Sequence, residues 1–226
     1  GFDFQCVVGA MRAPVTLGDP LVTFDRVVLS YGRHLALDQV TGAVCAGSLL
    51  AVLGPNGGGK SSFLKAFLGL SKLRSGIVRY HGVRPKHMAY LPQQLALDRS
   101  FPLRVYDAVA LGLCQQRGFW ADLEAAAKVR VMAALEQVGM ADYVDRSLDS
   151  LSGGQFQRVL FARLAVQDSS VILLDEPFAA IDAYTTNDLM DVLKTWHGEG
   201  RTIVVVSHDL DLVRDHFPET LILARS

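Results

Sequence analysis

A glycine-rich loop is the feature that most constrains this chain. Residues 54–61, Gly-Pro-Asn-Gly-Gly-Gly-Lys-Ser, match the phosphate-binding pattern G-x-x-x-x-G-K-[ST] at every fixed position. The apolar run 48–53 before the loop predicts a buried strand, and residues 62–68 after it carry apolar side chains at helical spacing. In that setting the glycines let backbone N–H groups converge on an anion, and the helix N-terminus adds partial positive charge. Lys60 can then reach the β- and γ-phosphates of a nucleotide, and the Ser61 hydroxyl can bind Mg²⁺.

Composition limits the class of protein around this loop. The chain has 226 residues, 50% of them hydrophobic, which suffices for one large domain or two small lobes with a substantial core. A net charge of −1 gives no electrostatic reason to expect nucleic acid as a main partner. Three scattered cysteines without a C-x-x-C pair suit a reducing compartment and argue against a disulfide scaffold or a zinc site.

The ends and apolar runs of the chain carry little targeting information. Residues 1–20 are expected to be a disordered extension because they contain two prolines and show little periodicity, and Met11 is a candidate for the natural start. No signal peptide is evident. No apolar run reaches the ~18 residues needed to span a bilayer, so a membrane role would require a separate membrane partner.

Short strands surround the loop in the sequence. Residues 21–29 and 37–44 predict two strands of a small antiparallel sheet beside the phosphate loop, and residues 77–80 predict another strand. Tyr31 lies between the first two segments. It can either stack on a nucleotide base or pack at a strand end, and spacing alone favours packing at a strand end.

A mostly helical lobe is expected in the middle of the chain. Within residues 95–150, the segments 105–113 and 122–138 predict helices, and the second of these has an apolar face. Internal packing is the default explanation of that face, and a docking site for a partner helix is the alternative. Residues 185–196 and 221–223 predict a further helix and a last strand.

A second glycine-rich helix start follows the lobe. Residues 151–155 read Leu-Ser-Gly-Gly-Gln and open a helix that runs to about residue 166. Ser152 is a good N-cap. Gly153 and Gly154 leave bare N–H groups at the helix N-terminus, which can face an anion. This is either a second phosphate site or a simple capped turn.

Polar side chains lie at the ends of three expected strands, a short one at residues 88–91 and buried ones at 171–176 and 202–207. Asp175 suits a water-mediated Mg²⁺ shell, and Glu176 suits a general base aimed at an attacking water. His208 can contact a γ-phosphate or hold the water, although a lone histidine is usually structural. Gln93 can bind Mg²⁺ or position water, or it can be a solvated loop residue. In an open parallel sheet, ligands bind at the carboxyl ends of the strands, where these residues are expected.

The order of these motifs identifies a known family. The chain resembles the ATP-binding subunits of ABC transporters over about residues 21–224, and the Leu-Ser-Gly-Gly-Gln stretch is specific to that family among phosphate-loop proteins. The resemblance implies an α/β fold: a phosphate-loop NTPase core with an antiparallel β subdomain and an inserted helical subdomain at about residues 95–165. It also implies an ATPase with ATP and Mg²⁺ as ligands.

The resemblance assigns roles to particular residues. The catalytic residues it implies are Glu176, His208 and Lys60. The nucleotide contacts within one subunit are Tyr31, Gly54, Pro55, Asn56, Gly57, Gly58, Gly59, Lys60, Ser61, Ser62 and Gln93. The contacts supplied by a second copy, closing head to tail, are Ser152, Gly153, Gly154, Gln155 and Asp182. The Mg²⁺ ligands are Ser61, Gln93 and Asp175, the last through water.

A finer resemblance concerns the transported cargo. The segment 89–112, beginning Ala-Tyr-Leu-Pro-Gln, is similar to that of subunits serving zinc, manganese or iron uptake. The implied partners are a second copy, an integral membrane permease and an extracytoplasmic substrate-binding protein, with this chain peripheral at the cytoplasmic face of the cell membrane. Another cargo (siderophore, haem or organic solute) and a soluble non-transport ABC protein remain the alternatives. The dimer-contact loop departs from the family pattern, since residues 179–182 read Ala-Ala-Ile-Asp where serine and leucine are commoner at the first and third places.

Overall fold

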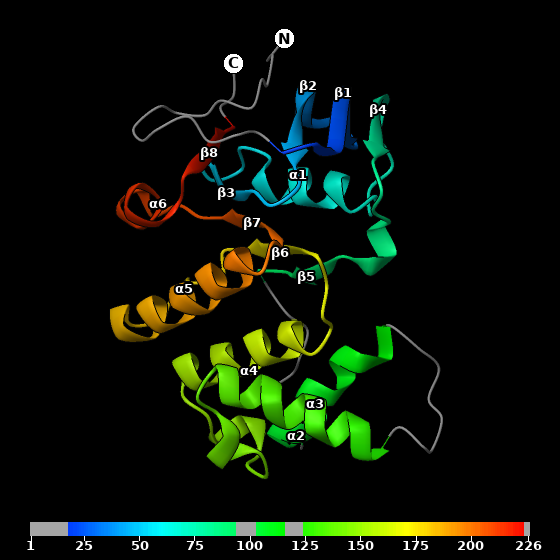
Figure 1. The fold of residues 1–226 in the computed structure, drawn as a ribbon. Helices are drawn as coiled ribbons and strands as arrows, with labels where there is room; N and C mark the ends of the chain where they lie inside the picture. Colours follow the sequence, from blue (N-terminus) through cyan, green and yellow to red (C-terminus); the bar gives the residue numbers. More distant parts are fainter. Residues whose placement is uncertain (1–17, 94–102, 116–123, 224–226) are drawn as a thin grey trace.

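Two β-sheets of different kinds organise the molecule (Figure 1). The computed structural model describes residues 18–93, 103–115 and 124–223. The antiparallel sheet has the order β2-β1-β4 and consists of β1 (Pro20–Tyr31), β2 (His34–Cys45) and β4 (Ser75–Tyr80). The parallel sheet has the order β5-β6-β7-β3-β8 and consists of β3 (Leu49–Leu53), β5 (Ala89–Leu91), β6 (Val171–Asp175), β7 (Thr202–Val206) and β8 (Glu219–Ile222). The expected α/β fold with an antiparallel subdomain is confirmed.

The hairpin of β1 and β2 extends further than the sequence pattern predicts. Tyr31 pairs with His34 across the two-residue turn, so the strands continue to the turn itself. At the other end Pro20 pairs with Cys45, one residue before the expected start of the domain. Residues 1–17 of the expected extension lie outside the described residues.

The parallel sheet is buried on both faces. Every residue of β3, β6 and β7 is buried, as expected for parallel strands that are covered by other layers on each side. Because the strands are parallel, their carboxyl ends meet at one edge of the sheet. Gly54 follows β3 at this edge, Asp175 ends β6, and Ser207 follows β7. The polar residues expected after the strands are therefore brought together there.

Helix α1 (Lys60–Phe67) lies between the two sheets (Figure 1). Its Phe63 ring stacks on Phe24 of β1 at 4.9 Å between centroids, and Phe67 packs edge-on against Phe63 at 6.3 Å. The same apolar cluster includes side chains of β3 and β7. This packing holds the first turn of α1, and hence the end of the phosphate loop, against both sheets.

The remaining helices lie on the other side of the parallel sheet and share one core cluster with its strands. Figure 1 shows α2 (Val105–Ala110), α3 (Glu124–Gln137) and α4 (Gly153–Ala165) grouped together, away from the antiparallel sheet. Helix α5 (Ala183–Gly198) joins them in one core cluster with the sheet, through Phe161, Leu189 and Trp196 among others. The expected helices at 105–113 and 122–138 are thus present within the described residues, while residues 94–102 and 116–123 of this region are not described.

Two helices differ from the prediction. Helix α6 (Leu210–His216) was not predicted, although Asp209 caps it by accepting a hydrogen bond from the Leu212 N–H. Helix α2 stops at Ala110 and continues as a 3₁₀ turn to residue 115. A Cβ on Gly112 would meet the Arg163 carbonyl oxygen at 2.5 Å, so the tighter turn lies directly against α4.

In the described ranges, no helix combines the length and the apolar character that a bilayer crossing requires.

Candidate functional site

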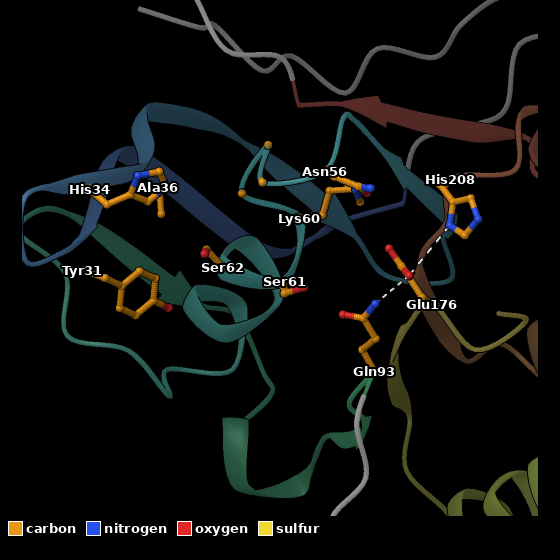
Figure 2. A pocket seen from close by; sticks show the side chains of 13 residues that line it. Tyr31, His34, Ala36, Asn56, Lys60, Ser61, Ser62, Gln93, Glu176 and His208 are labelled. Atoms are coloured by element: carbon orange, nitrogen blue, oxygen red, sulfur yellow. Dashed lines mark hydrogen bonds and ion pairs between the residues drawn. The ribbon is translucent and has the colours of Figure 1, made fainter. Parts of the chain in front are cut away.

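A pocket of about 540 Å³ opens at the carboxyl edge of the parallel sheet (Figure 2). It is lined by Tyr31, His34, Ala36, Asn56, Gly57, Gly58, Gly59, Lys60, Ser61, Ser62, Gln93, Glu176 and His208. The structure therefore brings together most of the residues that the sequence assigned to one subunit. Gly54, Pro55 and Asp175 are not among the lining residues. Gly54 and Pro55 accept hydrogen bonds from Lys60, and Asp175 has a hydrogen bond with Ser61.

Gly59 shows why the phosphate loop requires glycine. Gly59 has φ of 89°, in the left-handed region, and a Cβ there would collide with the carbonyl oxygen of Ala36. It is the N-cap of α1, and no side chain caps this helix end. The first N–H groups of α1 consequently remain available to an anion in the pocket.

Lys60 carries the positive charge of the loop. Lys60 is 6% exposed, and its Nζ donates hydrogen bonds to the carbonyl oxygens of Gly54 at 2.9 Å and Pro55 at 3.1 Å. A buried ammonium group needs such partners because burial of an unpaired charge is costly. The two carbonyls hold the amine beside the loop, where it can meet phosphate oxygens.

Asp175 is the last residue of β6, lies beside Ser61 and is 3% exposed. Its Oδ1 is buried and has no hydrogen-bond partner within the described part of the chain. Burial raises the pKa of this carboxyl, the nearby charge of Glu176 acts in the same direction, and a hydrogen bond with Ser61 opposes the shift. A buried carboxylate with an unsatisfied oxygen beside a serine hydroxyl is an arrangement that a hydrated cation can satisfy.

Glu176 is held where it leaves β6. Its φ is 51°, an unusual value for a residue other than glycine, and its N–H donates to the Val206 carbonyl oxygen at 3.0 Å. Gln93 Nε2 donates to Glu176 Oε2 at 2.8 Å, and His208 Nδ1 lies 3.8 Å from the same oxygen (dashed lines in Figure 2). The ends of three neighbouring strands thus place an amide, a carboxylate and an imidazole around one point of the pocket.

Tyr31 lies at the other end of the pocket from Glu176 (Figure 2). It is 47% exposed, and its hydroxyl lies 3.3 Å from Ser71 Oγ. Two lining residues, His34 and Ala36, were missed by the sequence reasoning. The signal for them was available in part: a two-residue turn after Tyr31 places His34 directly opposite it on β2.

The Ser-Gly-Gly-Gln turn (residues 152–155) does not line this pocket. Ser152 Oγ accepts from the Gln155 N–H at 3.2 Å, and the Ser152 N–H donates to Gln155 Oε1 at 3.0 Å, which is a capping box at the start of α4. The predicted N-cap is confirmed. Within one chain, however, the turn is separate from the phosphate loop, as expected if it serves another copy.

Asp182, the fifth residue assigned to the partner's nucleotide, also lies outside the pocket. It is the N-cap of α5 and accepts hydrogen bonds from the Thr185 N–H at 2.9 Å and Thr185 Oγ1 at 2.8 Å. These hydrogen bonds hold the pKa of the Asp182 carboxyl below its ordinary value. The carboxylate therefore shapes the turn at residues 179–182.

The fold and the site together define a class of protein. A glycine loop between a buried parallel strand and a helix, with a lysine in the loop and acids ending a neighbouring strand, is the arrangement of a phosphate-loop nucleotide-binding protein. A sequence profile of the ABC transporter family matches residues 37–179. The chain belongs to the ABC transporter family, and it is an ABC transporter ATPase.

Curated relatives agree over most of their length. The chain is 41% identical over 207 residues to the zinc transport system ATP-binding protein TroB of Treponema pallidum (strain Nichols), covering 89% of this chain and 77% of TroB. It is 36% identical over 206 residues to the manganese transport system ATP-binding protein MntB of Bacillus subtilis (strain 168), covering 89% of this chain and 82% of MntB.

Solved structures support the same assignment. The dimeric structure of a bacterial ABC transporter cassette superposes with a TM-score of 0.78 at 26% identity, covering 90% of this chain and 94% of the other. A nucleotide-free ATP-binding cassette superposes with a TM-score of 0.79 over 91% of this chain and 88% of the other, and its 21% identity supports the fold alone. ABC cassettes bind ATP, dimerise and act with membrane components of a transporter.

Proposed function

We propose that this chain hydrolyses ATP to drive a membrane importer for a transition-metal ion, zinc or manganese. The observation that carries the cargo assignment is the identity of 36–41% to ATP-binding proteins of zinc and manganese transport systems over 89% of this chain. Uptake of a siderophore, haem or an organic solute by the same ATPase is the alternative.

In this proposal one subunit holds the nucleotide in the pocket of Figure 2. The base stacks on Tyr31 at the exposed end, and the phosphates lie on residues 54–62, against the N–H groups at the start of α1. Lys60 supports this arrangement because its ammonium group is already held beside the loop by backbone carbonyls. It would neutralise charge on the β- and γ-phosphates.

The residues present fit a magnesium ion. The unsatisfied Asp175 Oδ1, the adjacent Ser61 hydroxyl and the Gln93 side chain form an oxygen-rich donor set with one carboxylate, which suits a cation that retains several waters. When bound, Mg²⁺ would neutralise charge on the phosphate oxygens. Ser61 and Gln93 would bind it directly, and Asp175 through water.

Glu176 would act as the general base on the attacking water. Its backbone is held by Val206, and its carboxylate is oriented by the amide of Gln93 and lies near the His208 imidazole. A base oriented in this way takes the proton of a water aimed at the γ-phosphate, and His208 would help to position that water.

The site would be completed by a second copy. The Ser-Gly-Gly-Gln turn and Asp182 do not reach the pocket of their own chain, so a head-to-tail dimer would place them on the partner's nucleotide. Such a dimer has two equivalent sites related by a two-fold axis. Residues 21–224 would form the single ATP-binding domain, with the helical subdomain at about 95–165 facing a membrane permease at the cytoplasmic face. An extracytoplasmic binding protein would deliver the metal ion.

Metal uptake in a deletion strain tests this proposal. A strain lacking the gene is complemented with the wild-type chain or with Glu176→Gln, and uptake of radioactive zinc and manganese is measured. The wild-type chain should restore uptake of at least one metal, and Glu176→Gln should not, because it cannot activate the water. Unchanged uptake of both metals in the deletion strain, with loss of haem or siderophore uptake, would favour the alternative cargo.

A further inference from the structure

Helices α4 and α5 carry the two turns that are assigned above to the partner's nucleotide, and the helices start side by side. A Cβ on Gly154 would lie 2.8 Å from Thr185 Oγ1 and 3.4 Å from Asp182 Oδ2, so the two helix starts touch. Further along, Phe161 of α4 stacks on Trp196 of α5 at 6.0 Å between ring centroids. The contacts therefore advance along both helices in the same direction, and both caps lie at the same end.

Arg158 makes the polar contact between these helices. It lies one turn beyond Gly154 on α4, and its Nη2 donates to Asp188 Oδ2, one turn beyond the start of α5. The side chains are 16% and 36% exposed, and among the described residues no other arginine–carboxylate ion pair is as shielded on both partners. A partly buried pair of this kind is energetically more significant than an exposed one.

The same guanidinium group also binds the end of α3. Arg158 Nη1 donates to the Val138 carbonyl oxygen at 3.1 Å, immediately after α3 ends at Gln137. Gly139 follows with φ of 68°, which terminates the helix. One planar fork thus joins three helices, and a lysine, with its single ammonium group, could not reproduce both directions.

This contact has a consequence beyond stability. Two helices that start side by side place the positive ends of their dipoles together, which disfavours close approach unless other groups hold them. Asp182 supplies negative charge at that end, and the Arg158–Asp188 pair holds the helices one turn away. Any change in this spacing would shift the Ser-Gly-Gly-Gln turn relative to the Asp182 turn. Small misplacements of groups that meet a reacting phosphate are costly to rate.

We propose that Arg158 and Asp188 are positioning residues that hold the Ser-Gly-Gly-Gln turn and the Asp182 turn in the relative placement that one partner nucleotide requires. The inference rests on the composite site proposed above. The pair touches no nucleotide of its own subunit, since neither residue lines the pocket. Its loss should affect closure of the dimer and turnover, and not the binding of ATP to the monomer.

The experiment compares Arg158→Ala, Asp188→Ala, the double variant and Arg158→Lys with a control, Lys194→Ala. Lys194 forms an exposed ion pair with Asp191 on the same helix α5, so its loss removes a pair without joining two helices. Four quantities are measured for each variant: ATP affinity of the monomer, turnover, ATP-dependent dimerisation in a Glu176→Gln background, and the thermal midpoint of unfolding.

Each alanine variant should lower turnover and weaken dimerisation by about tenfold, and the double variant should do little more, because contacting residues are not additive. Monomer affinity for ATP should stay within about twofold. Arg158→Lys should lie between the wild type and Arg158→Ala because it retains the ion pair and loses the contact with Val138. If Arg158→Ala does not fold, Arg158→Lys and Asp188→Ala carry the test.

Two results would overturn the inference. One is a lower thermal midpoint with unchanged turnover and dimerisation, which would make the pair purely structural. The other is an equal effect of Lys194→Ala. Ser152→Arg, measured in the same assays, separates this inference from the composite site. If Ser152→Arg blocks dimerisation and the Arg158 and Asp188 variants do not, only the inference fails. If Ser152→Arg also has no effect, the composite site fails with it.

Discussion

The N-termini of α1 and α4 are both glycine-rich helix starts, and their surroundings differ. At α1 no side chain caps the helix, and Lys60, Gln93, Glu176 and His208 converge on the same pocket. At α4 a serine and a glutamine cap the helix, and residues 152–155 are not among those that line the pocket. Two glycine-rich helix starts therefore differ: the start of α1 lies in a pocket with several polar side chains, and the start of α4 is a capped turn outside that pocket. In the dimer proposed above, the start of α4 would meet a nucleotide only across the interface between two copies.

Glu176→Gln should produce the largest effect, and it tests whether the α1 pocket contains the chemistry. Turnover should fall by ~10²–10⁴-fold, because the amide cannot take a proton from water. ATP binding should persist, and an ATP-bound dimer should accumulate. Phosphate release measures the first effect, and light scattering with ATP and Mg²⁺ measures the second. A variant that remains monomeric under these conditions would contradict the role proposed for the start of α4 at the dimer interface.

Lys60→Ala at α1 and Ser152→Arg at α4 should distinguish the roles of the two helix starts, because only the first should weaken ATP binding to the monomer. Lys60→Ala removes a charged hydrogen-bond donor and should weaken ATP binding to the monomer by about 10- to 100-fold, with a parallel loss of turnover. Normal binding and turnover in this variant would remove Lys60 from the phosphate site.

Ser152→Arg should suppress turnover by a similar factor, about 10- to 100-fold, because a bulky cation would replace the small cap at the dimer contact. Binding of ATP to the monomer should be unchanged, as titration of a fluorescent nucleotide would measure. Ser150→Arg is the matched control: Ser150 is exposed and lies two residues before the turn. If the two substitutions reduce turnover equally, the turn has no special role.

Tyr31→Ala should weaken ATP binding by roughly 5- to 100-fold, the range for loss of one base-stacking contact. Tyr31→Phe should retain most of the affinity, because the ring and not the hydroxyl would carry the contact. Titration with ATP and GTP measures both variants. If Tyr31→Phe binds ATP as weakly as Tyr31→Ala does, the affinity depends on the hydroxyl near Ser71 and not on base stacking.

Asp175→Asn should produce the smallest of these effects, a change in the stability of the folded protein and in how that stability depends on pH. Burial raises the pKa of Asp175 in the folded state, so the folded protein binds this proton more tightly than the unfolded chain does. Stability without nucleotide should therefore fall as pH rises from the ordinary aspartate pKa through the raised one, and Asp175→Asn should remove that part of the dependence. At neutral pH the variant should be more stable by on the order of 1 kcal/mol, while its response to Mg²⁺ with ATP is lost. Urea unfolding between acidic and neutral pH measures this, and an identical pH profile for both proteins would contradict it.

Much of the fold was predictable because its strands and helices have strong local patterns. The runs at β3, β6 and β7 are so apolar that only a strand buried on both faces accommodates them, and the glycine loop after β3 has one structural context. Helix α6 was missed because it has only seven residues and a single buried one, Val213, which leaves too little periodicity to detect. The lining residues His34 and Ala36 were missed because their place depends on the pairing of β1 with β2 and not on a motif.

By itself the sequence determined the phosphate loop, the acids at a strand end and the capped turn of α4, because each depends on residue types within a few positions of one another. Only the tertiary structure decided which of these features meet. It gathers Gln93, Glu176 and His208 around one point, since parallel strands end at a common edge. It leaves the Ser-Gly-Gly-Gln turn apart and ties its helix to α5 through Arg158 and Asp188, which lie 30 positions apart. Such distances in sequence are closed by packing, which no local pattern records.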